Sequence, residues 1–128
     1  MPRIVVIDDD ASIRDLLRIH LSGVGLTVEV FEDASAGIRS ILENHPDLLM
    51  LDLVLPDLSG LEVLQALKDD LATKDMPVVV LTSKTDGDTF LQAKRLGADA
   101  ILTKPVRREE LIACVLTQLA KSGASSEG

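Results

Sequence analysis

Aromatic residues and cysteine are scarce in this 128-residue sequence, which has no tryptophan, no tyrosine, two phenylalanines and one cysteine. The single Cys114 excludes an internal disulfide and a paired-cysteine metal cluster, and its place in a helical pattern indicates packing instead of redox chemistry. No apolar run approaches the roughly 20 residues of a membrane-spanning helix. The first residues enter an apolar stretch without the layout of a signal peptide. We therefore expect a cytoplasmic protein that does not bind membranes.

The remaining composition is that of a folded domain. Hydrophobic residues make up 46% of the chain and charged residues 27%, which provides enough apolar material for one core. The formal net charge of -8 opposes contact with nucleic acid and with anionic lipid. We therefore expect a protein partner and no direct binding of nucleic acid by this chain.

Five short apolar segments, each bounded by turn-forming or charged residues, predict β-strands at residues 4–7, 26–31, 48–51, 78–81 and 100–102. Apolar residues at helical spacing between and after them predict five helices, the fourth at about residues 86–96. The residues that mark the apolar helix faces are, in chain order, Ile13, Leu16, Leu17, His20 and Leu21; Ile38, Ile41 and Leu42; Leu61, Leu64 and Leu67; Phe90, Leu91, Ala93 and Leu96; and Leu111, Ile112, Val115, Leu116 and Leu119. Helix ends are marked by capping-box spacing and by glycines, at Ser12 with Asp15, Thr85 with Asp88, Gly23 and Gly97.

The alternation of strands and helices predicts an α/β fold, a doubly wound sheet of five parallel strands with helices on both faces. Three segments, 4–7, 48–51 and 78–81, are almost wholly apolar, as buried central strands are, whereas 26–31 alternates like an edge strand. These patterns fit the strand order 2-1-3-4-5. We assign residues 1–121 to one domain and residues 122–128, which are mostly small and polar, to a flexible tail or truncated linker.

Four of the five predicted strands bring polar residues to one place, whereas the second strand, at the edge, is followed only by Glu32-Asp33. The first strand is followed by Asp8-Asp9-Asp10, the third by Asp52, the fourth by Thr82-Ser83, and the fifth by a segment that contains Lys104-Pro105. The carboxyl ends of parallel strands meet at one edge of a sheet, and ligands bind there where the strand order reverses. We therefore expect these side chains to lie close together.

Crowded carboxylates require a compensating charge. Neighbouring strands lie about 4.8 Å apart, and two unit charges about 4 Å apart repel by roughly 4 kcal/mol near a protein surface. A divalent cation and Lys104 would offset this repulsion, and a few carboxylates with open coordination positions suit Mg²⁺. A carboxylate beside two cations can act as a nucleophile toward a phosphoryl donor, while Thr82 donates a hydrogen bond to the same group. The sequence thus predicts a phosphoryl-transfer site at Asp52.

Each of these residue types has a commoner structural role when it stands alone. An aspartate after a strand is most often a helix cap or part of a turn, which is our interpretation of Asp10 and Asp57. The acids, the hydroxyl and the lysine all fall at the carboxyl ends of the right strands, so coincidence is a poor explanation for the set. We assign structural roles to His20, on an apolar helix face, and to His45, in a loop, and not a phosphate relay.

The same residues carry a resemblance to a known family. The motifs are IVVIDDD at residues 4–10, PDLLMLDLVLP at 46–56, Ser59-Gly60, VLTS at 80–83, GAD at 97–99 and Lys104-Pro105. Over residues 3–120 the chain resembles the receiver domains of bacterial two-component systems, the CheY-like family. The resemblance implies a flavodoxin-like arrangement of the sheet described above and a phosphorylation switch.

By this resemblance, Asp52 is the phosphoacceptor and one of the ligands of a Mg²⁺ ion. Asp9 is expected to bind the ion directly, Asp8 mostly through water, and the backbone carbonyl of Val54 completes the protein ligands. Mn²⁺ is an expected substitute. The resemblance implies a signalling switch and not an enzyme in the usual sense, although the domain catalyses its own phosphorylation and dephosphorylation.

The resemblance also assigns Thr82 and Lys104 to contacts with the phosphoryl group. In the family, phosphorylation draws this threonine inward and remodels the surface formed by the fourth helix, the fifth strand and the fifth helix. Ile101 stands where the family usually has a switch aromatic residue, and Ser83 lies beside the switch threonine. We therefore expect partner recognition to differ from that of chemotaxis relatives. The Lys104-Pro105 peptide is expected to be cis.

Two positions are expected to tune the loss of the phosphoryl group. They are Val54, two residues after the phosphoacceptor, and Lys84, two residues after Thr82, because family side chains at these positions reach the attacking water. Valine cannot orient a water molecule. We therefore expect spontaneous hydrolysis of the aspartyl phosphate to be slow.

The implied phosphoryl donor is a sensor histidine kinase or a histidine phosphotransfer protein, and the output is an unidentified downstream protein or output domain. Cys114 and Ala100 replace charged residues by which the OmpR group of regulators pairs its subunits, so we expect a monomer or a weak phosphorylation-dependent dimer. Two alternatives stay open. One is a receiver fold that acts as a phosphorylation-independent interaction module, and the other is a flavodoxin-like small-molecule binder, which the lack of aromatic residues beyond Phe31 and Phe90 disfavours.

Overall fold

Strands and helices alternate along the chain in the computed structural model, which describes residues 1–83 and 87–122. The strands of these residues are β1 (Arg3–Ile7), β2 (Thr27–Phe31), β3 (Leu48–Asp52), β4 (Val78–Thr82) and β5 (Ala100–Thr103). The helices are α1 (Ala11–Ser22), α2 (Ala34–Glu43), α3 (Gly60–Asp69), α4 (Gly87–Arg95) and α5 (Arg108–Ser122). Every strand and helix predicted from the sequence is present, and boundaries differ by a few residues.

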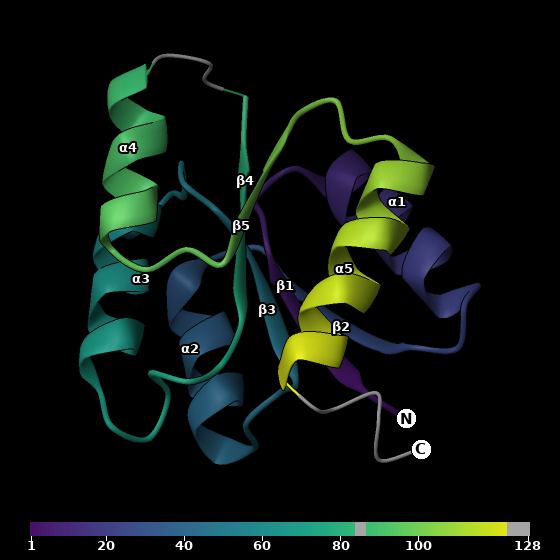
Figure 1. The fold of residues 1–128 in the computed structure, drawn as a ribbon, viewed down its shortest axis with the longest axis horizontal. Helices are drawn as coiled ribbons and strands as arrows, with labels where there is room; N and C mark the ends of the chain where they lie inside the picture. Colours follow the sequence, from purple (N-terminus) through teal and green to yellow (C-terminus); the bar gives the residue numbers. More distant parts are fainter. Residues whose placement is uncertain (84–86, 123–128) are drawn as a thin grey trace.

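All strand pairs of the sheet are parallel, in the order β2-β1-β3-β4-β5. Helices α1 and α5 cover one face, and α2, α3 and α4 cover the other (Figure 1). The predicted doubly wound α/β fold and its strand order are therefore confirmed. The order reverses between β1 and β3, so the carboxyl ends of these two strands lie side by side.

The core consists of two apolar layers, one on each side of the sheet. The residues of β3 and β4 are all buried, as are those of β1 after its first residue, whereas β2 lies at the edge and is only half-buried. This contrast agrees with the continuous and the alternating apolar patterns of the sequence. Strands β3 and β4 extend one residue further than predicted, so Asp52 and Thr82 are their last residues.

The start of α1 differs from the prediction. The capping residue is Asp10, which accepts hydrogen bonds from Ser12 N at 2.8 Å and Ile13 N at 3.4 Å. The predicted capping box at Ser12 and Asp15 is therefore wrong, because the helix already begins at Ala11. The interpretation of Asp10 as a cap is confirmed.

Four predicted core residues of the helices are exposed, namely Leu42, Phe90, Leu91 and Leu116. Helical spacing of apolar residues therefore predicted more of each helix as core than the structure buries. The prediction for Gly97 is confirmed, since it follows α4 with a φ of 103°, a conformation that glycine adopts without strain. Gly23 likewise ends α1, as predicted.

Three predictions involve residues outside the described part of the chain. The capping pair of Thr85 with Asp88 and the tuning position Lys84 involve residues 84–86. Most of the predicted tail, residues 123–128, is also outside it. Ser122, the first residue assigned to that tail, is the last residue of α5 and its hydroxyl donates to Leu119 O at 2.9 Å.

Candidate functional site

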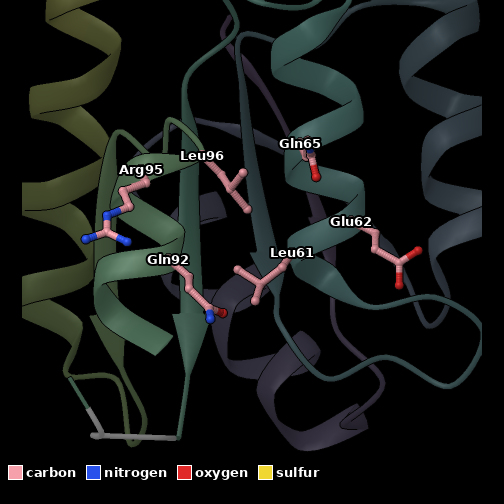
Figure 2. A pocket seen from close by; sticks show the side chains of 6 residues that line it. All are labelled: Leu61, Glu62, Gln65, Gln92, Arg95 and Leu96. Carbon is pink, nitrogen blue, oxygen red and sulfur yellow. The ribbon is translucent and has the colours of Figure 1, made fainter. Parts of the chain in front are cut away.

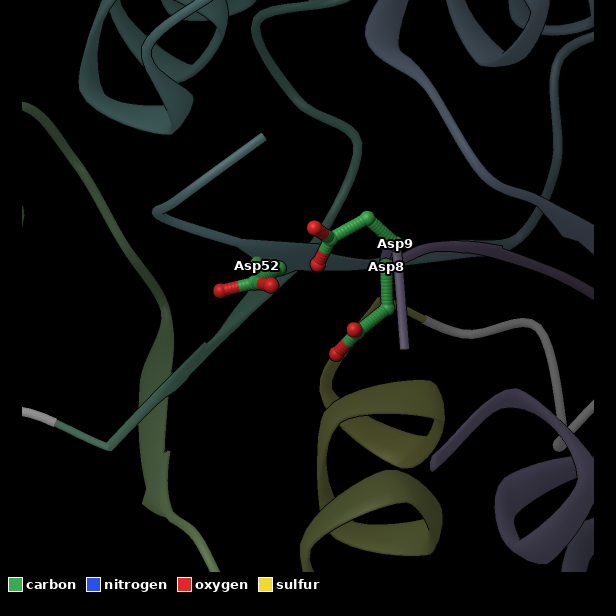
Figure 3. A group of neighbouring side chains, drawn as sticks. All are labelled: Asp8, Asp9 and Asp52. Carbon is green, nitrogen blue, oxygen red and sulfur yellow. The ribbon is translucent and has the colours of Figure 1, made fainter. Parts of the chain in front are cut away.

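Three carboxylates meet at the carboxyl edge of the sheet. Asp8 and Asp9 follow β1, and Asp52 ends β3 (Figure 3). One oxygen from each can be chosen such that all three lie within 4.8 Å of one another. Asp8 is fully buried and Asp52 is 5% exposed, whereas Asp9 is exposed. The cluster predicted from the sequence is therefore present, with an opening to solvent at Asp9.

Lys104 supplies a positive charge to the two buried acids. Its Nζ lies 2.8 Å from Asp8 Oδ2 and 3.3 Å from Asp52 Oδ2. Asp8 Oδ2 is buried. Apart from the ion pair with Lys104, no group in the described part of the chain forms a hydrogen bond of good geometry with this oxygen. The other oxygen of Asp8 accepts from Asp10 N at 2.9 Å. Two buried carboxylates thus share one cation, and Asp8 Oδ2 retains capacity to bind a further one.

The charges of the site shift the pKa values of its groups. The pKa of Asp52 is raised from 3.8 to about 6, mainly because the carboxylate is buried and also because the negative charge of Asp8 lies nearby. A hydrogen bond from Val54 N at 3.1 Å and the charge of Lys104 act in the opposite direction. Burial alone would lower the pKa of Lys104, but its contacts with Asp8 and Asp52 outweigh burial and raise the pKa.

The donor atoms of the cluster fit a hard divalent cation. The three carboxylates offer only oxygen ligands, which is the set that Mg²⁺ prefers. Val54, whose carbonyl is the predicted fourth protein ligand, lies two residues after Asp52 and forms an isolated β-bridge with Ser59. Val54 is 58% exposed, so the loop beside the cluster is open to solvent.

The other predicted site residues belong to β4, to β5 and to the segments that follow them. Thr82 is buried, pairs with Thr103 across the sheet, and its carbonyl accepts from Lys104 N at 2.8 Å. Ser83 is exposed, and Ile101 is half-buried against the core layer beneath α2, α3 and α4. The Lys104-Pro105 peptide is cis, as expected.

Sequence reasoning did not identify two polar contacts that support the site. Arg14 Nη1 donates to the carbonyl of Asp8 at 2.8 Å, and Asp57 binds the start of α2. A basic side chain near the N-terminus of a helix is unfavourable unless it has a partner. The place of Arg14 in the first turn of the predicted helix could therefore have indicated a contact of this kind. For Asp57, predicted as a turn or cap residue, the sequence contains no sign that the capped helix is α2.

Gly60 allows the loop after Asp52 to turn closely over the strand end. A Cβ atom at Gly60 would lie 2.3 Å from Asp52 O and 2.4 Å from Leu53 Cα. The amide of Gly60 donates to Leu53 O at 2.9 Å. The glycine of the Ser59-Gly60 motif therefore allows the start of α3 to pack directly against the backbone of the acidic strand end.

A separate groove of about 280 Å³ lies between α3 and α4 (Figure 2). Its lining residues are Leu61, Glu62, Gln65, Gln92, Arg95 and Leu96. None of the residues predicted to bind metal or phosphate belongs to it. The chemistry predicted from the sequence is therefore confined to the acidic edge of the sheet.

A family model for the response regulator receiver domain matches residues 4–116. The chain belongs to the response-regulator receiver family. This receiver domain is 38% identical over 120 residues to the DNA-binding response regulator MtrA of Mycolicibacterium paratuberculosis, covering 94% of the chain and 52% of MtrA. It is 41% identical over 122 residues to the DNA-binding dual master transcriptional regulator RpaA of a Synechocystis strain, covering 95% and 51%. The chain thus spans about half the length of these relatives.

Solved structures of receiver domains have the same fold. A CheY-like receiver domain protein from Methanospirillum hungatei is 27% identical with a TM-score of 0.89, and the match covers 100% of this chain and 99% of that one. NtrX from Brucella abortus is 30% identical with a TM-score of 0.88, and the match covers 98% of this chain and 29% of NtrX. The match thus spans almost all of the first solved chain and less than a third of NtrX.

Membership of the family establishes the general role of the chain. It is the receiver domain of a two-component response regulator, a phosphoacceptor that works as a signalling switch. Receiver domains typically bind Mg²⁺, and the acidic cluster is present here. The reading as a phosphorylation-independent module is not favoured. Among the helices that the structure describes, none has the length and apolar character of a membrane span.

Proposed function

We propose that Asp52 accepts a phosphoryl group from a phosphohistidine of a sensor histidine kinase or a histidine phosphotransfer protein. The observation that supports this assignment is the position of its carboxylate, which is buried, lies in the cluster with Asp8 and Asp9, and is 3.3 Å from Lys104 Nζ. Asp52 is also the last residue of β3, at the reversal of strand order where ligands of such sheets bind.

Asp8, Asp9, Asp52 and the carbonyl of Val54 would hold Mg²⁺, or Mn²⁺ in its place. When bound, the ion neutralises negative charge on the oxygens of the transferred group. The buried Asp8 Oδ2, which has the Lys104 ion pair but no hydrogen bond of good geometry among the described residues, supports this assignment. The exposed Asp9 leaves a side of the cluster open for the donor to approach.

In the proposed transfer, a carboxylate oxygen of Asp52 forms a bond to phosphorus as the bond from phosphorus to the donor nitrogen breaks. Asp52 must be ionised for this attack, and its pKa of about 6 in the absence of metal places the ionised form above that pH. Lys104 neutralises charge on the transferred oxygens, and the Thr82 hydroxyl donates a hydrogen bond to one of them. The same residues, with water as the attacking group, would catalyse slow hydrolysis of the aspartyl phosphate.

We propose that the output surface is formed by α4, β5 and α5, and that Ile101 in β5 responds to the phosphoryl group. Exposed apolar side chains on α4 and α5, Phe90, Leu91 and Leu116, support the use of this surface for protein contact. The receiver domain itself is proposed not to contact nucleic acid, because its net charge is -8. The named relatives are DNA-binding proteins, of which this chain spans about half.

We further propose that residues 1–121 form the receiver unit and that this unit works as a monomer or a weak phosphorylation-dependent dimer. Three residues, Val54, Lys84 and Ser83, are proposed to tune the lifetime of the phosphorylated state. Response regulators generally act in the cytoplasm, and we place this chain there.

Mass spectrometry after incubation with acetyl phosphate and Mg²⁺ tests the assignment of Asp52 as the phosphoacceptor. We expect the mass of one phosphoryl group on the native protein and none on Asp52→Asn. A native protein that gains neither a phosphoryl group nor a beryllofluoride adduct would overturn it.

A further inference from the structure

The loop of residues 53–59, which joins β3 to α3, is tied at its tip to a different helix. Asp57 Oδ1 accepts from Ala34 N at 3.0 Å, and Asp57 Oδ2 accepts from Ser35 N at 3.0 Å. Asp57 Oδ2 also accepts from Ser35 Oγ at 2.7 Å. Asp57 therefore binds the first turn of α2 through both carboxylate oxygens. We call these three hydrogen bonds the Asp57 clamp.

Helix α2 has a cap of its own. Its N-cap residue is Asp33, whose side chain accepts from Ala36 N at 2.8 Å. A single N-cap side chain is the usual arrangement at the start of a helix. The Asp57 clamp thus adds a connection between two loops that the helix does not require in order to begin.

Burial holds the 53–59 loop only in part. Leu53 is buried in the core and Leu55 is half-buried against it, whereas Val54 is 58% exposed and Leu58 is 41% exposed. At the end of the loop, Gly60 N donates to Leu53 O at 2.9 Å. The first residues of the loop are therefore held by burial, whereas its exposed tip is held by the Asp57 clamp.

The Asp57 clamp spans the acidic cluster. Strand β1 lies between β2 and β3 in the sheet, α2 follows β2, and the 53–59 loop follows β3. The clamp therefore connects the segments on either side of the end of β1, where Asp8 and Asp9 lie. In the clamped loop, Val54 N donates to Asp52 Oδ1 at 3.1 Å, and the carbonyl of Val54 is the proposed metal ligand.

We propose that Asp57 is a positioning residue for the phosphorylation site, an inference that rests on the proposed function. By holding the 53–59 loop against α2, it keeps the amide of Val54 on Asp52 and the carbonyl of Val54 in place for Mg²⁺. Hydrogen bonds from Ser35 and Ala34 lower the pKa of Asp57 to about 2, so it stays an ionised acceptor above that pH. Removal of groups that orient metal ligands typically changes metal affinity by about 10–100-fold.

The test compares three variants of the 128-residue chain. Asp57→Ala removes the clamp, Asp57→Asn removes the same charge but keeps one acceptor oxygen, and Asp33→Ala removes a carboxylate from the same end of α2 without touching the 53–59 loop. For each, the Kd for Mg²⁺ is measured by NMR titration and the hydrogen exchange of the Val54 amide is measured in metal-free protein. Urea denaturation reports the stability of every variant.

We expect Asp57→Ala to raise the Kd for Mg²⁺ about tenfold and to speed exchange of the Val54 amide. Asp57→Asn should fall between Asp57→Ala and wild type, and Asp33→Ala should match wild type in both measurements despite a loss of stability. If Asp57→Ala and Asp33→Ala change the Kd for Mg²⁺ and the exchange of the Val54 amide equally, Asp57 only caps α2 and the inference is overturned. Equal effects of Asp57→Ala and Asp57→Asn would assign the change to lost charge and overturn it as well.

Failure of the proposed function gives a different result. In that case the wild-type protein would bind no Mg²⁺ and gain no phosphoryl group at Asp52, whatever residue 57 is. Exchange of the Val54 amide in metal-free protein would still report whether Asp57 holds the loop.

Discussion

Lys104 Nζ lies closer to Asp8 than to Asp52, at 2.8 Å from Asp8 Oδ2 and 3.3 Å from Asp52 Oδ2. A single ammonium group therefore connects the ends of β1 and β3 from the segment that follows β5. Lys104 lowers the pKa of Asp52, but burial and the charge of Asp8 outweigh it, so the pKa stays raised and the charge of Asp52 is only partly compensated. In the proposed function, Mg²⁺ supplies the missing positive charge.

Replacement of Lys104 with Gln should slow phosphorylation of Asp52 by about 100-fold, the lower end of the effect of removing one group that stabilises developing charge. The free energy of unfolding should also fall, because Asp8 and Asp52 lose their shared cation. The rate is measured as aspartyl phosphate formed from acetyl phosphate in excess Mg²⁺. Lys121→Gln, exposed on α5, is the control and should behave as wild type.

Asp52→Asn should stabilise the metal-free protein near pH 8 by about 1–3 kcal/mol, since each unit of pKa shift is worth about 1.4 kcal/mol. The pKa of Asp52 is about 6 in the folded protein, and its ordinary value, which applies to the unfolded chain, is 3.8. Between these two pH values, the carboxyl is protonated in the folded protein and ionised in the unfolded chain. The free energy of unfolding of wild type should therefore fall as pH rises across this window, and the variant should lack that part of the fall.

Urea denaturation of both proteins from about pH 4 to pH 8 measures this effect through the shift in ΔG of unfolding. Asp75→Asn serves as the control, because Asp75 is exposed and precedes β4 at the opposite edge of the sheet. An Asp52→Asn curve parallel to that of wild type across the window would contradict the expectation.

Val54→Asn should speed loss of the phosphoryl group, because an amide at this exposed position can orient the attacking water and valine cannot. The half-life of the phosphorylated protein is followed by mass spectrometry after removal of the phosphodonor. Val24→Asn, in an exposed loop between α1 and β2, is the matched control. An unchanged half-life in Val54→Asn would discredit the tuning role of this residue.

Gly60→Ala should destabilise the protein by about 1–3 kcal/mol, the usual cost of forcing an extra methyl group into a packed site. The added Cβ would lie 2.3 Å from Asp52 O, so the start of α3 or the end of β3 has to move. Gly87→Ala is the control, because nothing lies within 4 Å of a Cβ at Gly87 and the residue begins a helix. Stability is measured by urea denaturation, and a Gly60→Ala variant as stable as Gly87→Ala would show that the strand end yields without cost.

The fold and the acidic cluster were predictable because they depend on patterns local to each segment. A run such as residues 48–51 is apolar on both faces only if helices cover both sides of its strand, and the alternation of 26–31 identifies an edge. Once the strand order is known, the meeting of Asp8, Asp9 and Asp52 follows from the geometry of parallel strands.

The burial of individual helix residues was predicted less well, because the sequence pattern does not show which of them the neighbouring helices and strands cover. Leu42 has the spacing of a core residue in α2 and is nevertheless 57% exposed, and Phe90 and Leu91 in α4 are also exposed. Whether the border of an apolar stripe is covered depends on the elements that pack beside it. That is a property of the assembled molecule.

The sequence by itself determined the α/β class, the strand order and the residues of the acidic edge, since periodicity and charge are read along the chain. Only the tertiary structure decided which groups hold that edge in place: Arg14 on the carbonyl of Asp8, Asp57 on the start of α2, and Gly60 against the backbone of Asp52. The physical reason is that a hydrogen bond or a close approach depends on the relative position of segments that lie far apart in the chain, and no local pattern encodes that position.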